Sequence, residues 1–491
     1  MKKFYKPLTI IVINLWLIIN LKHGDYGLFS SLIWIISIFW LYKSIKKPKL
    51  NFNKNNQIPP FFYFLLFFIF LLKIIYISFY SSSVFFHGDE ALISRSAQSN
   101  FESGIKLGNW NILSSDKGTL NQLPALWYFI QGGIIYLFGP SLLSIKLFTI
   151  LSDLILSIFI YLIINKLCNK YLALFSLFLY ISLPIAIHFS MTGYQNLQST
   201  VILYWSIYLL CLIPKKPNYK ALIYYCLVSG IVCGLSLYFY LSSSINPLIC
   251  LLIIFFIISF EYNQPLILKL KYLLASTSYF MIGLITIAVP YLYYSIFEYN
   301  FINGRSSEII FNKLKPGVIN ILVLQAKNFV QGFLPTGVFN GSGQFYINIS
   351  LLPNMILFLF FIIGLAISIF NFKKRKYFIP LIVLTITSIT GGVLTKDSPA
   401  PQRLIHIFPV VIILIVFSID LLKKKWLKVA AVTCCLFINI YSFIHKNIPE
   451  YQKNLDLDVY EVSKIINNDA VKLYFNAPIH KKDQIYYYSK G

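Results

Sequence analysis

Charged residues are scarce in this chain of 491 residues, and acidic residues are the scarcest of them. Only 12% of the residues are charged, and Asp and Glu together number 17. In contrast, 57% of the residues are hydrophobic and 18% are aromatic. A soluble protein of this length has no core large enough to bury so much apolar surface. The composition therefore excludes a soluble globular protein and indicates that lipid surrounds most of the chain.

The cysteines do not indicate a disulfide-bonded or metal-binding protein. Of the seven cysteines, Cys168 lies near a basic loop and the others lie in or beside apolar segments. Their spacing fits neither a disulfide framework nor a zinc site. These residues are expected to pack as small apolar side chains.

Basic residues outnumber acidic ones by 42 to 17, which gives a formal net charge of +25. They fall in short clusters between apolar runs, at Lys43–Lys54, Lys166–Lys170, Lys215–Lys220, Lys269–Lys271, Lys373–Lys376 and Lys423–Lys428. This distribution is typical of the cytoplasmic loops of a membrane protein. It excludes nucleic acid as a partner, because no basic, aromatic-interleaved soluble domain is present.

A membrane-spanning helix needs about 20 predominantly apolar residues, with shorter spans at the lower limit. The candidate spans are 7–22, 27–42, 60–80, 141–164, 170–190, 198–213, 220–240, 245–260, 272–296, 351–371, 378–395, 404–422 and 427–445. With the basic clusters on the cytoplasmic side, about thirteen spans alternate, the N-terminus is cytoplasmic and the C-terminus is external. The first run resembles a signal peptide but has no small-residue cleavage site, so it is predicted to remain as part of a hairpin.

Leu123–Gly139 is an apolar segment that does not fit this alternation as a span, because counting it would invert every later basic loop. It begins near Pro124 and carries Trp127, Tyr128 and Tyr136. Such aromatic residues favour a helix lying flat at the external interface. A tilted or re-entrant helix is the alternative.

The expected fold class is an all-α polytopic membrane protein of about 13 transmembrane helices, with interfacial helices in the first external loop and a small external α/β tail. Three parts are predicted: 1–58, a hairpin and a basic loop; 59–445, the membrane core; and 446–491, the tail. Within the core, 81–140 and 297–350 are predicted to be external. The tail is expected to hold one helix and two short strands.

The segment FFHGDEALISRS follows the span at 60–80 and places Asp89 beside Glu90, with His87 before them and Arg95 after. Two interpretations fit this pair. Carboxylates stabilise the first turn of a helix, so the pair can simply mark a helix start. Two adjacent carboxylates can also accept a proton from a nucleophile or hold a cation.

Two polar segments are expected at other external ends of spans. In the loop at 188–199, Tyr194, Gln195 and Asn196 are side chains that either bind sugar hydroxyls or a phosphate, or only cap two helices. The segment at 237–248, with the letters LYFYLSSSINPL, adds a corner rich in hydroxyl groups.

Isolated ionisable residues complete the set of candidates. Lys117, Arg305 and Arg403 are external cations, each able to bind a phosphate or to anchor the chain at the interface. Lys73 and Asp153 are the main ionisable residues deep in spans. A proton-coupled transporter is built around such groups, so their scarcity counts against one.

The order of these motifs resembles the membrane-embedded glycosyltransferases of the GT-C type. A span ends in DEA, followed by ESG, a proline-led aromatic helix, LFGPSLLSIKLFTILSDLILSIFIYLI, a polar second loop, GLSLYFYLSSSINPL, FINGRSSEI and PAPQRLIHIFP. More narrowly, residues 60–445 resemble the branch of protein O-mannosyltransferases and lipid A aminoarabinose transferases, which is glycosyltransferase family 39-like.

The resemblance implies a sugar donor carried on a polyprenyl phosphate and a catalytic acid in the first external loop. It makes Asp89 the catalytic base and Glu90 its support, with a divalent metal ion at this pair as the only cofactor to consider. Lys117, Arg305 and Arg403 are nominated by position for binding of the donor phosphate, and His87, Arg95, Tyr194, Gln195 and Asn196 are the candidates for substrate binding. The acceptor would be a glycan, lipid or protein on the external face of a bacterial plasma (inner) membrane.

Two positions depart from this pattern. Relatives commonly carry another acid in the second external loop, where MTGYQNLQ has none, and aminoarabinose transferases tend to place a lysine where Leu123 precedes Pro124.

Two other functions are alternatives. A transporter or flippase of a lipid-linked saccharide predicts related halves and broken helices, and an O-antigen ligase or polymerase would use an external pair such as Arg403 and His406.

Overall fold

The computed structural model describes residues 35–39, 43, 59–79, 88–107, 126–216, 218–297, 318–334, 351–394 and 403–449, and at a few helix positions, Asp89 among them, the backbone alone. Within these ranges the chain forms helices and no strands. The main helices are α3 (Pro60–Phe79), α4 (Gly88–Leu107), α5 (Leu126–Phe138), α6 (Leu142–Leu167), α7 (Lys170–Ser182), α8 (Pro184–Ser190), α9 (Asn196–Cys211), α10 (Tyr219–Ser236), α11 (Asn246–Phe256), α12 (Leu266–Phe297), α14 (Val318–Phe333), α15 (Met355–Phe370), α16 (Arg375–Thr387), α17 (Ile407–Asp420) and α18 (Lys425–Ser442). Short helical turns are η3 (Leu241–Ile245), η4 (Ile257–Glu261), η5 (Ser388–Val393) and η7 (Phe443–Asn447).

The all-helical, membrane-spanning architecture predicted from the sequence is confirmed. Six helices among the described residues are long and apolar enough to cross a membrane, or up to eight if each of two bent pairs is one span. The count of thirteen spans stays a prediction. The spans at 7–22 and 27–42 lie wholly or largely outside the described residues, as does the tail beyond residue 449.

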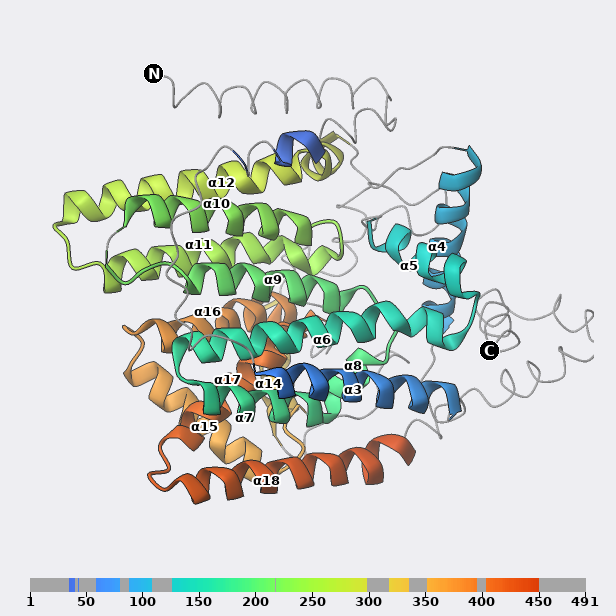
Figure 1. The fold of residues 1–491 in the computed structure, drawn as a ribbon. Coiled ribbons are helices and arrows are strands. Elements are labelled where there is room, and N and C mark those ends of the chain that lie inside the picture. The colour runs from blue at the N-terminus through green and yellow to red at the C-terminus, as the bar shows by residue number, and fades with distance from the viewer. Residues whose placement is uncertain are drawn as a thin grey trace, which may run out of the picture.

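The long helices lie side by side with similar axes, and α4 crosses one end of this bundle with α5 beside it (Figure 1). The loops that carry or adjoin basic clusters, between α6 and α7, α9 and α10, α11 and α12, and α17 and α18, lie at the opposite end (Figure 1). The bundle therefore has one basic end and one end covered by α4 and α5.

Polar side chains cap the starts of several long helices. Asn169, Asn218 and Asn354 each accept a hydrogen bond, at 2.9–3.1 Å, from the backbone N–H three residues further along. At the start of α6, Ser141 and Ser144 form a reciprocal capping box. These side chains bond backbone N–H groups that no helical carbonyl can reach, which is why Asn and Ser are preferred there.

A proline divides the span predicted at 170–190 into α7 and α8, whose axes differ by 68°. Leu183 is extended, with φ −66° and ψ 120°, and Pro184 is the first residue of α8. Proline has no backbone N–H and disfavours helical conformation in the residue before it, so the helix breaks at this point. The break leads the chain into the loop that meets α4.

The helices α10 and α12 pack with their backbones in contact. A Cβ atom on Gly230 would overlap the carbonyl oxygen of Phe280, and one on Gly283 would overlap that of Leu227. Small residues permit this close approach, which is a common mode of association between membrane helices. The contact fixes α12 against α10 at one side of the bundle (Figure 1).

The interfacial helix predicted at 123–139 is α5, and it packs tightly against α4. A Cβ atom on Gly132 would overlap the backbone of Ala97. Trp127 and Tyr128 are fully buried, whereas Leu137 at the other end of α5 is 76% exposed. Protein therefore covers the first half of α5, and the flat position of the helix at a membrane interface stays a prediction.

One helix was not predicted from the sequence. The segment predicted as an external loop at 297–350 contains α14, whose Phe329 and Phe333 are buried. The ring of Phe333 stacks on Phe361 of α15, with 5.5 Å between the ring centroids. The apolar residues of α14 recur with a helical period and not as a continuous run, so a search for membrane spans passes over them.

Candidate active site

Glu90 lies in the first turn of α4 and is completely buried. Its Oε2 atom accepts a hydrogen bond of 2.9 Å from the backbone N–H of Gly193 and lies 3.1 Å from Lys146 Nζ of α6. The Lys146 side chain is also fully buried. A buried carboxylate needs both a counter-charge and hydrogen bonds, and Glu90 receives both from segments far away in the sequence.

Lys146 joins three segments of the chain at this point. Its ammonium group donates to Glu90 Oε2 and, at 2.7 Å, to the carbonyl oxygen of Met191, which follows α8. The start of α4, the first turns of α6 and the loop between α8 and α9 are thereby held together. Helices α4, α6 and α9 all begin at this end of the bundle (Figure 1).

Because Gly193 has no side chain, the loop between α8 and α9 can approach Glu90 closely. A Cβ atom there would overlap the Cγ2 methyl of Ile145 and would lie 3.3 Å from Glu90 Oε2. Glycine is therefore the residue that lets the backbone N–H reach the carboxylate.

Asp89 precedes Glu90 in the same turn of α4. The adjacent pair thus starts a helix, as one interpretation of the sequence predicted, and within the pair Glu90 bonds to Lys146 and to Gly193. A role of the pair in proton transfer stays a prediction.

The second predicted group, Tyr194, Gln195 and Asn196, lies directly after Gly193 and leads into α9. Gln195 and Asn196 are buried, and the carbonyl oxygen of Tyr194 accepts a long contact of 3.5 Å from Thr149 Oγ1 of α6. The structure therefore brings this group beside the Glu90–Lys146 pair.

The remaining predicted residues are less closely connected with this pair. Arg95 is exposed on α4 and donates to Gln98 Oε1 over 3.4 Å, which is a weak hydrogen bond. Arg403 lies just before α17, where its backbone approaches Gly391 closely. His87, Lys117 and Arg305 lie outside the described residues.

The donor set at Glu90 does not fit a metal ion. Among the side chains that the structure describes, no group of three or more His, Cys, Asp or Glu residues could hold one. At Glu90 itself, the Lys146 ammonium stands where a cation would approach Oε2. The divalent ion considered from the sequence is therefore not assigned to Glu90.

A second buried ion pair lies deeper in the bundle. Lys73 Nζ of α3 is 2.7 Å from Asp153 Oδ2 of α6, and it donates over the same distance to Ser190 Oγ of α8. Tyr180 of α7 donates to Asp153 Oδ1 at 2.8 Å. The sequence identified Lys73 and Asp153 separately as ionisable residues within spans, and the structure shows that they are partners.

The sequence pattern did not predict Lys146 and Gly193 as site residues. A signal for Lys146 was present, since a lone lysine in the first turns of an apolar span needs an acidic partner. No comparable signal marks Gly193, because its role depends on the contact with Ile145.

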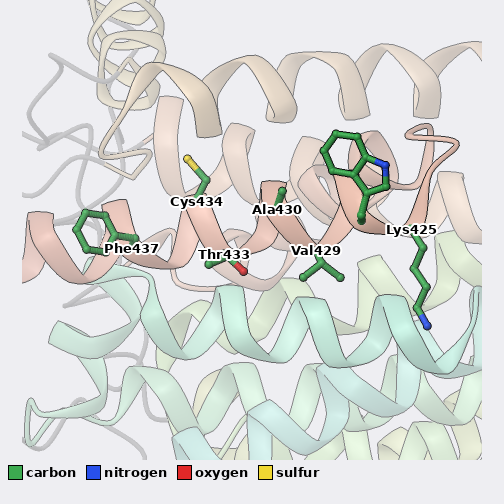
Figure 2. A pocket seen from close by; sticks show the side chains of 7 residues that line it. Lys425, Val429, Ala430, Thr433, Cys434 and Phe437 are labelled. Carbon is green, nitrogen blue, oxygen red and sulfur yellow. The ribbon is translucent and has the colours of Figure 1, made fainter.

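An open groove of about 1020 Å³ runs along α18, far along the chain from Glu90. Its lining residues are Lys425, Trp426, Val429, Ala430, Thr433, Cys434 and Phe437. Figure 2 shows these side chains along one face of the helix, from Lys425 to Phe437. This mainly apolar face suits contact with lipid and is separate from the candidate active site.

Residues 122–294 match the family model of dolichyl-phosphate-mannose-protein mannosyltransferases. The matched stretch includes Lys146 and Gly193 and begins after Asp89 and Glu90. No curated protein sequence is similar enough to the chain to count as a match.

Two membrane transferases of known structure share the fold. ArnT from Cupriavidus metallidurans bound to undecaprenyl phosphate has a TM-score of 0.53 at 13% identity, with 87% of this chain and 74% of that chain covered. The oligosaccharyltransferase AglB from Archaeoglobus fulgidus, in complex with an inhibitory peptide and a dolichol-phosphate, has a TM-score of 0.51 at 13% identity, with 88% of this chain covered. The chain spans 60% of the length of that enzyme. The resemblance to GT-C type glycosyltransferases is confirmed at the level of the family model and the fold.

Proposed function

We propose that this chain is a membrane glycosyltransferase that moves a sugar from a polyprenyl-phosphate donor to an acceptor. One observation carries the proposal. Lys146 of α6 and Gly193 of the loop before α9 both bond to the turn that contains Asp89 and Glu90. This junction lies partly within the stretch matched by the mannosyltransferase family model. It supports the proposal because it holds an acidic turn rigidly at one end of a membrane bundle.

Asp89 is the proposed base. Glu90 is already neutralised by Lys146 and bonded to Gly193, so its role in the proposal is to fix the first turn of α4. In the transfer step, an acceptor oxygen or nitrogen attacks the anomeric carbon and its proton passes to the Asp89 carboxylate. The bond from the anomeric carbon to the phosphate oxygen breaks, and polyprenyl phosphate leaves with the electron pair. A positioned base of this kind typically contributes about 10²–10⁴ to the rate.

The leaving phosphate requires cations, which stabilise the developing charge. Arg403 is our candidate among the described residues, since guanidinium binds phosphate through two parallel hydrogen bonds. Lys117 and Arg305 are proposed for the same role from the sequence. We place the α4–α5 end of the bundle on the external face, because the basic loops lie at the other end (Figure 1).

The proposal is tested with purified protein in detergent or nanodiscs and a radiolabelled sugar on undecaprenyl phosphate. Wild type is expected to release the lipid phosphate and label an acceptor fraction, and Asp89→Asn is expected to lose at least about 10² of this rate. Glu102→Gln, on the same helix, is the matched control and should retain it. Transfer by Asp89→Asn at the wild-type rate would remove Asp89 from catalysis, and failure of wild type to bind any such donor would overturn the proposed function.

The alternative of a transporter has less support. Its expected midplane polar site would have to use Lys73 and Asp153, which bond to each other and to Ser190 and Tyr180. The ligase-like alternative would use His406, whose Nδ1 atom lies 2.7 Å from Thr200 Oγ1 of α9. Neither observation favours these functions over sugar transfer.

A further inference from the structure

Three buried side chains near the start of α9 have polar atoms that nothing in the described part of the chain satisfies. These atoms are Gln195 Oε1, both Oδ1 and Nδ2 of Asn246, and Nε2 of His406. The three side chains are at most 2% exposed. Buried polar groups in native proteins are almost always hydrogen-bonded, so a cluster of exceptions calls for a partner from outside the chain.

The side chains come from separate segments of the chain, and hydrogen bonds tie the segments of Asn246 and His406 to the first turns of α9. Ser243 Oγ of η3, one turn before Asn246, donates to Ser199 Oγ at 2.7 Å. His406, just before α17, pairs its Nδ1 with Thr200 Oγ1 at 2.7 Å. Thr200 lies only about 8 Å along the helix axis from residue 195, so the segments of Gln195 and His406 meet within about the length of one sugar ring and its substituents.

The free atoms have the chemistry of a site for hydroxyl groups. They include acceptors, Gln195 Oε1 and Asn246 Oδ1, and a donor, Asn246 Nδ2, whereas His406 Nε2 can act as either according to its tautomer. Each sugar hydroxyl donates one hydrogen bond and accepts others, so it matches an uncharged mixture of this kind. A carboxylate or phosphate would instead call for cations.

The cluster also lies close to the candidate active site. Gly193, which bonds to Glu90, is only two residues before Gln195. Arg403, the candidate for the donor phosphate, is three residues before His406. A sugar among Gln195, Asn246 and His406 would therefore have the acidic turn and the phosphate-binding candidate as neighbours.

We propose that Gln195, Asn246 and His406 form a subsite that binds the hydroxyl groups of the donor sugar and selects among sugars. This inference rests on the proposed function, in which the donor is a sugar on a polyprenyl phosphate. The segment at 237–248, noted in the sequence as a corner rich in hydroxyls, contributes Asn246 and Ser243 to it.

The test compares binding of two lipids to the full chain by thermal shift or equilibrium titration. The probes are undecaprenyl phosphate alone and undecaprenyl phosphate carrying glucose, mannose, galactose or arabinose. Wild type is expected to bind at least one sugar-bearing lipid about tenfold more tightly than the bare lipid, as one or two hydrogen bonds would provide. Asn246→Leu, which keeps the volume and removes the amide, is expected to lose most of this preference.

The same variant distinguishes a binding role from a structural one. Because unsatisfied buried amides destabilise a protein, Asn246→Leu is expected to raise the melting temperature of the ligand-free chain while it weakens sugar preference. Gln195→Leu provides a second variant from another segment and should change the preference in the same direction. Asn439→Leu on α18 is the matched control, since its buried amide bonds only to Ser182 among the described residues.

The inference is overturned if Asn246→Leu and Gln195→Leu keep the wild-type preference, or if wild type binds every sugar-bearing lipid no better than the bare one. Failure of the proposed function has a different signature. In that case wild type binds a sugar-bearing lipid, and the variants alter this binding, yet no sugar is transferred to any acceptor.

Discussion

The ammonium group of Lys146 lies 3.1 Å from Glu90 Oε2, and both side chains are fully buried. The two residues are 56 positions apart in the sequence and belong to helices that cross each other. Water cannot screen or solvate either charge at such a site, so each side chain depends on the other. This dependence predicts that the pair tolerates substitution poorly.

Removing one member of the pair is expected to destabilise the protein strongly. Lys146→Met leaves the Glu90 carboxylate buried without its counter-charge, which costs about 3–5 kcal/mol. Unfolding of the detergent-solubilised protein by heat or denaturant measures this loss. The double variant Glu90→Gln/Lys146→Met should recover part of it, because no unpaired charge remains. Lys166→Met, an exposed lysine at the other end of α6, is the control and should cost little.

A methyl group at position 193 is expected to reduce activity more than stability. In Gly193→Ala the new Cβ atom overlaps Ile145 Cγ2, so the loop must shift and its N–H moves away from Glu90 Oε2. A misplacement of this kind typically reduces a rate by about 10²-fold. Steady-state transfer assays measure the effect. Combining the change with Ile145→Ala removes the obstructing methyl and should restore part of the rate, and a fully active Gly193→Ala would contradict the expectation.

The hydroxyl of Tyr180 is expected to contribute to stability through Asp153. It donates to Asp153 Oδ1 at 2.8 Å, and a hydrogen bond to a charged group is worth about 1.5–3 kcal/mol. Tyr180→Phe should lower the free energy of unfolding by this amount. Tyr161→Phe is the matched control: its buried hydroxyl has no hydrogen-bond partner within the described ranges, so the change should be neutral or stabilising. If both variants lowered the free energy of unfolding equally, the hydrogen bond to Asp153 would make no specific contribution to stability.

Arg375 is expected to resist replacement even by lysine. Its guanidinium pairs with Glu261 through two nitrogens and donates to the carbonyl oxygens of Cys211 and Ile213, at 3.1 and 2.6 Å, at the end of α9. A lysine cannot reproduce this planar set of bonds. Arg375→Lys is therefore expected to cost about 2–3 kcal/mol in unfolding experiments. Lys374→Ala, at the exposed neighbouring position, should change stability by less than about 0.5 kcal/mol.

Hydropathy and the positions of basic residues predicted most of the helices, because both properties are local. The span at 60–80 corresponds to α3, and that at 427–445 to α18. The break at Pro184 was not predicted, since a proline is tolerated within membrane helices and hydropathy continues through it. The amphipathic α14 was missed for a related reason, because it lacks a continuous apolar run.

The candidate site was predictable only in part. Asp89 and Glu90 stood out as two adjacent acids in a chain with few of them. Their partners depend on tertiary contacts that no local pattern encodes: Lys146 appears as an isolated cation, and Lys73 and Asp153 are 80 residues apart. Pairing of this kind follows from the crossing of helices, which a single sequence does not specify.

The contact between α10 and α12 also limits how a lipid can reach the protein interior. At Gly230 and Gly283 the two backbones touch, so at this level the space between the helices is too narrow for a hydrocarbon chain. A polyprenyl tail that enters sideways from the bilayer must therefore pass elsewhere around the bundle. The glycines thus close the wall of the bundle between α10 and α12 at this level.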